Sequence, residues 1–223
     1  GSEMCIRDSN VTVEVIDMKK TDIILLTGLI GAILYSNFAQ VGFVVSNLEN
    51  DVLRMHILAN SDSEEDQRLK LKVRDRLLEC SDEIFGGCET LEDMESAAGS
   101  RLDYINGIVL QVIEENGFDY GAQTNLVNMD FDSRVYGNIT MPAGNYEALR
   151  VTIGEAEGHN WWCVMYPPLC IPAAETVESD DETAKDYFSK EELDLMENPD
   201  DYQVKLKCVE VFKGLKSKIK KIF

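Results

Sequence analysis

Three kinds of side chain in this sequence could carry covalent chemistry: thiols, imidazoles and carboxylates. Cys163 has two candidate bases, because His56 and His159 are the two histidines of the chain. A thiol next to an imidazole is a common nucleophile. The sequence indicates no third group that would orient the base, and an oxidising compartment would oppose a free catalytic thiol. A bridged or buried Cys163 is the alternative interpretation.

Metal and carboxylate chemistry have weaker signals. Two histidines, scattered cysteines and the lack of a C-x-x-C pair argue against a zinc site, and no cofactor is expected. The 41 acidic residues leave a hydrolytic carboxylate pair open, although no two have a distinctive spacing. The net charge of −20 argues against binding to nucleic acid, because phosphate backbones carry the same sign.

The stretch GHNWWCVMYPPLC, residues 158–170, contains both tryptophans of the chain. Its spacing allows a disulfide between Cys163 and Cys170 across the Pro-Pro turn without proving it. On a strand, side chains alternate between two faces. One face would carry Trp162, Val164 and Tyr166, and the other Trp161, Cys163 and Met165. Since both faces are apolar, we expect another segment, such as the tail or the Pro-Pro loop, to cover the second face, or that face to be a docking surface.

Two helices and an early strand are predicted to position these residues. The alternation in DVLRMHILAN, residues 51–60, predicts a strand. Ser61 and Glu64 fit a capping box for the helix that follows. A second helix of about 26 residues is predicted from a cap at Thr90 and Asp93 to a C-terminal stop at Gly117.

Four runs rich in β-branched and aromatic residues follow the second helix: TNLVNMDF, SRVYGNITM, YEALRVTIG and NWWCVMY. Turn residues separate them, which favours a sheet built largely from antiparallel strands. The predicted fold is therefore α+β: an antiparallel or mixed sheet with two long helices packed on one face, over residues 48–172.

The N-terminal region is typical of an export signal. Residues 18–47 are interpreted as a signal peptide or membrane anchor with a linker, since two lysines precede an apolar run. Ala39 is a candidate last residue if the signal is cleaved, and residues 23–45 could contact a membrane. Residues 1–17 lie upstream of the plausible start at Met18 and are interpreted as a non-native leader, with a genuine extension as the alternative.

The C-terminal region has two parts. Residues 173–202 are predicted to be an acidic loop, with a short helix around Lys190–Met196 as the alternative, and 175–201 contain twelve acidic and two basic side chains. Residues 203–223 are predicted to start as a strand and to end as a basic amphipathic tail. This Lys-rich tail could contact anionic lipid or the acidic body of the chain, or be a solvated helix.

Two long strings resemble a known family. RMHILANSDSEEDQRLKLKVRD, from Arg54, and YGNITMPAGNYEALRVTIGEAEGHNWWCVMYPPLC, from Tyr136, are similar to the signatures of stage II sporulation protein R. The resemblance spans about 53–171. It implies a signalling protein of endospore formation, made in the forespore and exported across its membrane into the intermembrane space, secreted or anchored. There it would activate a membrane-embedded aspartic-type protease, which removes the pro-sequence of the early mother-cell sigma factor.

The resemblance implies no enzyme and supplies no catalytic residues. We expect the partner surface to be formed or shaped by a set from both strings: His56, Asn60, Ser61, Asp62, Asn160, Trp161 and Trp162, with Cys163 and Cys170 as a candidate disulfide. The hypothesis from another class is a secreted hydrolase that uses Cys163 or a carboxylate pair.

Overall fold

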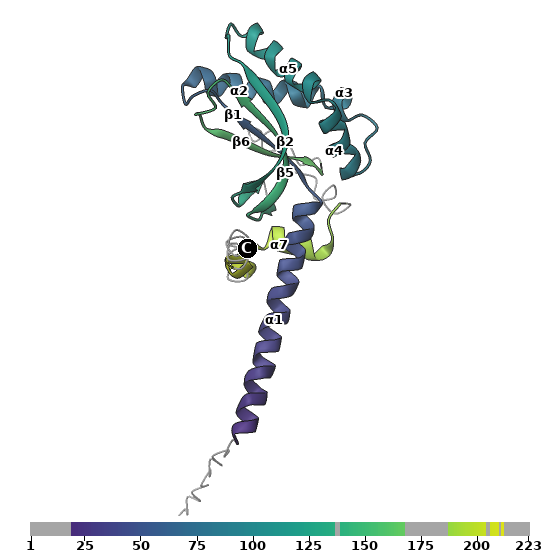
Figure 1. Ribbon diagram of the computed structural model, residues 1–223, viewed down its shortest axis with the longest axis vertical. Coiled ribbons are helices and arrows are strands. Elements are labelled where there is room, and N and C mark those ends of the chain that lie inside the picture. The colour runs from purple at the N-terminus through teal and green to yellow at the C-terminus, as the bar shows by residue number, and fades with distance from the viewer. Residues whose placement is uncertain (1–18, 137–138, 168–186, 204–205, 210, 212–223) are drawn as a thin grey trace, which may run out of the picture. The chain divides into compact units, whose positions relative to one another are not determined.

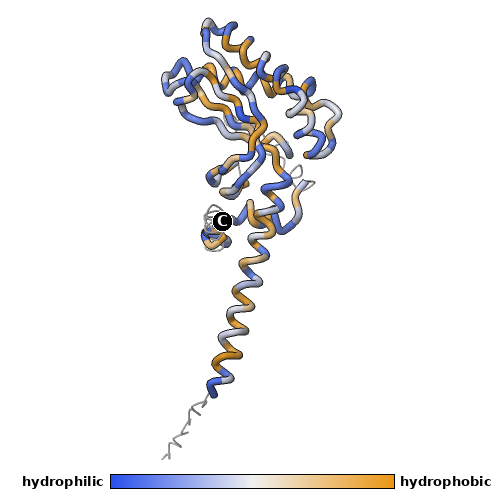
Figure 2. Tube along the Cα trace, viewed as in Figure 1, coloured by the Kyte–Doolittle hydropathy of each residue, from blue (hydrophilic) through white to orange (hydrophobic). Residues whose placement is uncertain are grey.

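The computed structural model describes residues 19–136, 139–167, 187–203, 206–209 and 211 (Figure 1). The chain divides into two units, residues 1–39 and 40–223, which are described separately. The first unit contains the start of helix α1 (Lys20–Asn50), where the backbone N–H of Lys19 donates to Asp22 at 3.0 Å. By length and composition α1 is able to cross a membrane, and Figure 2 shows largely apolar residues along it after its polar first turn.

The second unit is built around a four-stranded mixed sheet with the order β2-β5-β1-β6. The strands are β1 (Leu53–Leu58), β2 (Ala122–Phe131), β5 (Gly144–Ile153) and β6 (Asn160–Tyr166). β1 runs parallel to β5 and antiparallel to β6, and β2 runs antiparallel to β5. The α+β class and the mixed sheet predicted from the sequence are confirmed.

Four helices cover the first face of the sheet: α2 (Glu64–Glu79), α3 (Ser81–Phe85), α4 (Leu91–Ser100) and α5 (Leu102–Glu115). Figure 1 shows them grouped over the strands. Alternate residues of β1 and β5 point into this layer, so Met55, Ile57 and Leu149 are buried in one cluster with Val73 of α2 and Val109 of α5. This cluster is the larger of two cores.

The helix ends show which capping predictions hold. Thr90 and Asp93 form the predicted capping box of α4. Gly117, at φ +79°, ends α5: its N–H donates to Glu114 and the N–H of Phe118 to Ile113. The predicted cap at Ser61 is wrong. Ser63 caps α2 instead, by accepting the N–H of Asp66 at 3.1 Å.

The long second helix is broken where the sequence predicted continuity. Arg101 has φ −115° and ψ 16°, outside the helical region, and separates α4 from α5. Its guanidinium donates to the carbonyls of Glu83 and Ile84 at the end of α3. The break lets α4 pack beside α3 while α5 follows the sheet.

The second face of the sheet is covered at one end by three segments. These are the hairpin of β3 (Arg134–Tyr136) and β4 (Ile139–Met141), the last turns of α1, and α7 (Lys190–Glu197). The run SRVYGNITM is therefore two paired strands rather than the one predicted, and residues 137–138 between them lie outside the described residues. Val41, Val45 and Leu48 of α1 are buried in this second cluster.

The C-terminal region also differs from its prediction. Of the two alternatives for the segment around Lys190–Met196, loop or short helix, the helix is present as α7. The described residues in 199–211 are helical, which corrects the predicted strand there. Tyr202, Leu206 and Val209 recur at helical spacing and pack against the second cluster, with Val209 beside Gly42 of α1. The Lys-rich end, 212–223, lies outside the described residues.

Candidate functional site

Strands β1 and β6 bring the two family-like strings side by side. In their antiparallel register His56 lies opposite Trp162, and Leu58 opposite Asn160. The predicted residues of the first string therefore meet those of the second at the C-terminal end of β1. They divide into a ring stack on the second face of the sheet and a loop junction beyond the strand ends.

The ring stack is formed by His56 and Trp162, with centroids 3.8 Å apart and planes within 6°. The Nε2–H of His56 donates to the Oδ1 of Asn160 at 2.9 Å, since the amide oxygen is an acceptor. Burial lowers the pKa of His56 to about 4, a shift that the bond to Asn160 opposes and nearby Arg150 increases. His56 is therefore neutral near pH 7, while Trp162 remains partly exposed.

The loop junction joins the β1–α2 loop (residues 59–63) to the β5–β6 loop (residues 154–159). Asn60 bridges them: its Oδ1 accepts the N–H of Glu155 at 3.0 Å, and its backbone carbonyl accepts that of Glu157 at 3.1 Å. The Nδ2 group of Asn60 donates to Asp66 at 2.9 Å. The role of Asn60 in this structure is to hold two loops and the start of α2 together.

Asp66 is the acceptor on which this junction converges. Its Oδ2 also accepts the hydroxyl of Ser61 at 2.5 Å. Burial acts to raise the pKa of Asp66, but hydrogen bonds from Ser61, Asn60 and Tyr120 outweigh it, and the pKa lies below its usual value. Ser61 is thus engaged by a buried carboxylate, which explains why the cap of α2 falls to the next serine, Ser63.

Asp62 and His159 form the exposed rim of the loop junction. Asp62 accepts the backbone N–H of His159 at 2.6 Å and also the ring Nδ1–H. Desolvation acts to raise the pKa of Asp62, but these hydrogen bonds lower it below its usual value. The carbonyl of His159 accepts from the buried Lys70 of α2 at 2.9 Å. His159 is therefore held in place as part of the rim.

Two glycines allow the loops to approach this closely. A Cβ at Gly158 would lie 2.3 Å from the carbonyl oxygen of Ser61, a backbone atom that cannot swing away. Gly154 has φ +58°, and a Cβ there would lie 2.1 Å from the Oδ1 of Asn60. Side chains at either position would push the two loops apart.

Trp161 and Cys163 lie on the first face of the sheet, opposite His56 and Trp162. The guanidinium of Arg74 on α2 lies 4.5 Å from the centre of the Trp161 ring, and Trp161 packs against the larger core. Cys163 is buried and disulfide-bonded. Its predicted partner, Cys170, lies outside the described residues, and that pairing stays a prediction.

A nucleophilic pair of Cys163 and His56 is contradicted by this geometry. The thiol is engaged in a disulfide, and the two side chains point to opposite faces of the sheet. His159 is held by Asp62 at the rim. Among the described residues, no group of three or more histidine, cysteine or carboxylate side chains is arranged to hold a metal ion.

One predicted face assignment on β6 is wrong. Trp162 and Val164 do share the second face, but Tyr166 packs against the first-face core. The register between β1 and β6 shifts at Leu53 and Arg54, and such a bulge reverses the direction of the side chains beyond it. The hydroxyl of Tyr166 donates to the carbonyl of Glu89 at 3.3 Å.

Sequence reasoning missed Arg150 and Arg134 as functional candidates. Arg150 on β5 lies beside His56 in the parallel register, and Asn125 of β2 lies on its other side. Arg134, on the β3–β4 hairpin, places its guanidinium 5.9 Å from the centre of the Trp162 ring. An arginine within the apolar run EALRVTI was a visible signal, but its neighbours depend on strand order.

Arg54 was also missed, and it is a fully buried cation. Its guanidinium lies 4.1 Å from the centre of the Phe131 ring and 5.0 Å from that of Tyr146, and it donates to the hydroxyl of Tyr136 at 2.7 Å. Burial lowers the pKa of Arg54, against the attraction of the tyrosine hydroxyls. This aromatic cage joins the hairpin to the sheet beneath the ring stack.

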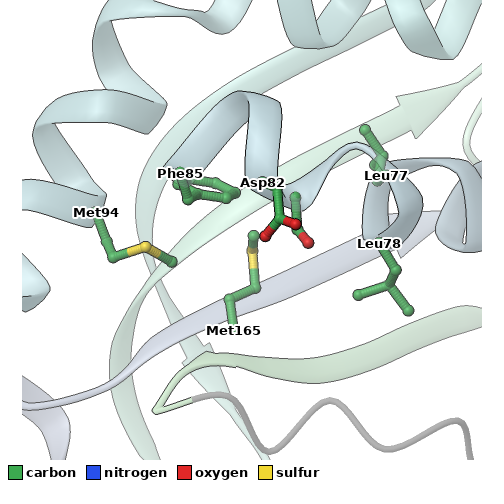
Figure 3. A pocket seen from close by; sticks show the side chains of 7 residues that line it. Leu77, Leu78, Asp82, Phe85, Met94 and Met165 are labelled. Carbon is green, nitrogen blue, oxygen red and sulfur yellow. The ribbon is translucent and has the colours of Figure 1, made fainter. Parts of the chain in front are cut away.

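A pocket of about 250 Å³ opens on the first face, away from the ring stack. Figure 3 shows Met165 rising from β6 toward α3, with Met94 of α4 on one side and Leu78 of α2 on the other. Asp82 is the charged side chain of its lining. Its other lining side chains are apolar except for Ser81, and none of the predicted site residues lines it.

Comparison with known proteins identifies the family. A family model described as stage II sporulation protein R matches residues 49–176, which contain β1 to β6 and both strings. A curated relative, stage II sporulation protein R of Bacillus subtilis (strain 168), is 35% identical over 124 residues, covering 56% of this chain and 55% of the relative. The chain thus matches about half the length of that relative. No solved structure shows significant similarity. Because the family model covers more than half of its residues, the chain belongs to the stage II sporulation protein R family.

Proposed function

We propose that this chain is an exported intercellular signal of endospore formation that acts by binding, not by catalysis. Its partner is a membrane-embedded aspartic-type protease, and the outcome is processing of the pro-form of the early mother-cell sigma factor. The observation that carries the proposal is the family match over residues 49–176, which covers the sheet and its helices.

Two features of the chain support export. Helix α1 has the length and composition of a membrane-crossing segment, and the apolar side chains of its first part are exposed, such as Ile24, Leu25 and Leu29. A disulfide at Cys163 is compatible with an oxidising compartment outside the cytosol. The chain would therefore meet its partner from the forespore-facing intermembrane space, secreted or held by α1.

Activation by binding sets a thermodynamic requirement on the partner surface. A ligand shifts a protease to its active state only if it binds that state more tightly than the inactive one. Trp162 is partly exposed, while His56 behind it and the aromatic cage below hold its ring in one orientation. A rigid aromatic side chain of this kind is a typical binding hot spot, because little entropy is lost on contact.

The proposal is tested by co-expressing the full chain with the protease and the pro-sigma factor in a non-sporulating host. Processing is expected only when all three are present. A variant with Leu29→Arg and Ile30→Arg should be synthesised but should not support processing of the pro-sigma factor, since two charges in α1 oppose membrane insertion. Replacing the neighbouring Thr27 with Ser is the control. Equal processing without this chain, or by the arginine variant, would contradict the proposal.

The contact surface is tested by comparing the two tryptophans. Trp162→Ala should lower the processing rate at least about tenfold at a temperature where the variant is fully folded, and it should also lower stability because the ring packs on His56 and Phe131. Trp161→Ala should lower stability first, because its ring packs against the core and under Arg74. Normal processing by a folded Trp162→Ala protein would place the contact elsewhere.

A further inference from the structure

On the part of the second face that no described helix or hairpin covers, the charged side chains from the strands are all positive. One row across the sheet contains Asn125, Arg150, His56 and Trp162, in the order of strands β2, β5, β1 and β6, and Arg134 lies over the Trp162 ring. We call these five residues the open row. By strand alternation, no aspartate or glutamate of these four strands points to this face. In a chain of net charge −20, this is a local concentration of positive charge.

The two arginines of the open row have no carboxylate partner within the described part of the chain. Neither Arg134 nor Arg150 forms an ion pair there, whereas Arg74 and Arg76 on the helical side each pair with a carboxylate. The Nε–H of Arg150 is buried and meets no acceptor among the described residues. A buried donor without an acceptor is unfavourable, so this group favours binding of an acceptor from outside.

The chemistry of the occupant follows from these groups. A guanidinium is geometrically matched to a carboxylate, with which it forms two parallel hydrogen bonds. The partly exposed ring of Trp162 beside it suits an aliphatic or aromatic neighbour, and the exposed amides of Asn125 and Asn160 can bind a peptide backbone. An extended polyanion such as a nucleic acid would be repelled by the acidic remainder of the chain. A short acidic protein segment carries fewer negative charges than a nucleic acid and would be repelled less.

We propose that the open row binds an acidic segment of the partner protein, with Arg150 donating to a carboxylate and Arg134 supplying a second positive charge above Trp162. If the partner is the protease, this binding proposal rests on the proposed function, and the open row is then the surface that contacts the protease. The buried cage of Arg54 and the stacked His56 then serve to hold the receiving surface rigid.

The proposal is tested first by charge neutralisation in the co-expression assay with the full chain. Arg150→Gln and Arg134→Gln should each lower the processing rate at least tenfold while the protein accumulates normally. Arg68→Gln, which removes the same charge from the exposed side of α2, should leave the rate unchanged. Arg134 is exposed, so its variant stays informative even if Arg150→Gln lowers stability. Wild-type processing by folded Arg134→Gln and Arg150→Gln proteins would overturn the proposal.

Exchanging charges between Arg150 and the protease distinguishes a direct contact from a purely structural role of Arg150. Arg150→Glu should abolish processing, and a lysine in place of one outward-facing aspartate or glutamate of the protease should restore it. A purely structural role for Arg150 predicts that none of the protease variants restores processing, and that result would count against the site.

A second experiment uses no protease. The full chain in zwitterionic detergent is titrated with a peptide of alternating glutamate and leucine, and with its glutamine counterpart, while the Nε–H signal of Arg150 is followed by NMR. The signal should shift with the glutamate peptide only; no shift with either peptide overturns the carboxylate site. A shift without any processing by the wild-type chain would instead contradict the proposed function and leave the site standing.

Discussion

The imidazole of His56 lies flat against the indole of Trp162, 3.8 Å between ring centroids. The edge of the same indole is packed by Phe131, whose centroid lies 4.7 Å away, and Phe131 in turn lies beneath the guanidinium of Arg54. A partly exposed tryptophan is thus fixed by a continuous stack of buried rings and one buried cation. Its orientation is set by the core of the protein and not by its surface.

The buried imidazole makes the folded protein sensitive to mild acid. The pKa of His56 is about 4 in the folded state, against about 6.5 when unfolded. The unfolded chain therefore binds more protons between these values, so the free energy of unfolding falls as the pH drops from 6.5 to 4. Urea unfolding should show a loss of roughly 2 kcal/mol from pH 7 to 4.5, at ~1.4 kcal/mol per pKa unit. His56→Phe, which keeps a ring on Trp162, should reduce this loss, and His159→Gln should not.

Asp66 is expected to hold the loop junction through its negative charge. Asp66→Asn replaces the carboxylate that accepts from Ser61 and Asn60 with a neutral amide, which has one acceptor oxygen, and should lower the free energy of unfolding by roughly 1–3 kcal/mol. Hydrogen exchange of the Glu155 and Glu157 amides should accelerate, because both bond to Asn60. Glu65→Gln, at the exposed neighbouring position, is the control. Unchanged exchange in Asp66→Asn would show that the junction does not depend on this carboxylate.

Close backbone approach at Gly158 predicts intolerance of any side chain. Gly158→Ala brings a Cβ against the carbonyl of Ser61 and should lower the unfolding temperature by several degrees. Gly121→Ala, where a Cβ meets nothing within 4 Å, should leave it nearly unchanged. Thermal unfolding followed by circular dichroism makes the comparison. Equal temperatures for both variants would mean that the loops can separate without cost.

The last turns of α1 are predicted to be structural. Leu48 is fully buried in the second core, so Leu48→Ala should cost about 2–5 kcal/mol of unfolding free energy. Phe43, on the same helix, is 67% exposed, and Phe43→Ala should have little effect. Chemical denaturation of both full-length variants tests the pair. A small effect at Leu48 would mean that the domain folds without α1.

Local signals in the sequence predicted local structure well. The alternation of residues 51–60 marks β1, Thr90 with Asp93 caps α4, and Gly117 ends α5. The predicted helix boundaries were wrong where a side chain contacts a group outside the motif on which the prediction rested. Ser61 has the right spacing for a cap, but a buried carboxylate engages it. Arg101 interrupts a regular apolar stripe because its guanidinium reaches the end of α3.

The candidate site was predicted in part for the same reason. His56, Asn160 and Trp162 do come together, because the antiparallel pairing of β1 with β6 aligns their strings. Arg150 joins them only through the parallel pairing of β1 with β5, and strand order is not encoded in any single segment. Trp161 was expected to shape the partner surface together with Trp162, although the predicted alternation already put it on the other face, where it packs against the larger core.

The position of β1 in the middle of the sheet has a consequence for timing. Its residue Leu53 pairs with Glu147 of β5 on one side and with Tyr166 of β6 on the other. Strand β1 is synthesised first but can pair only after β5 and β6 have been made. A chain threaded through a translocation channel would stay unfolded until Tyr166 has emerged on the far side. Under the proposed function, a partly exported chain would not present the surface around Trp162, because β6 would still be missing from the sheet.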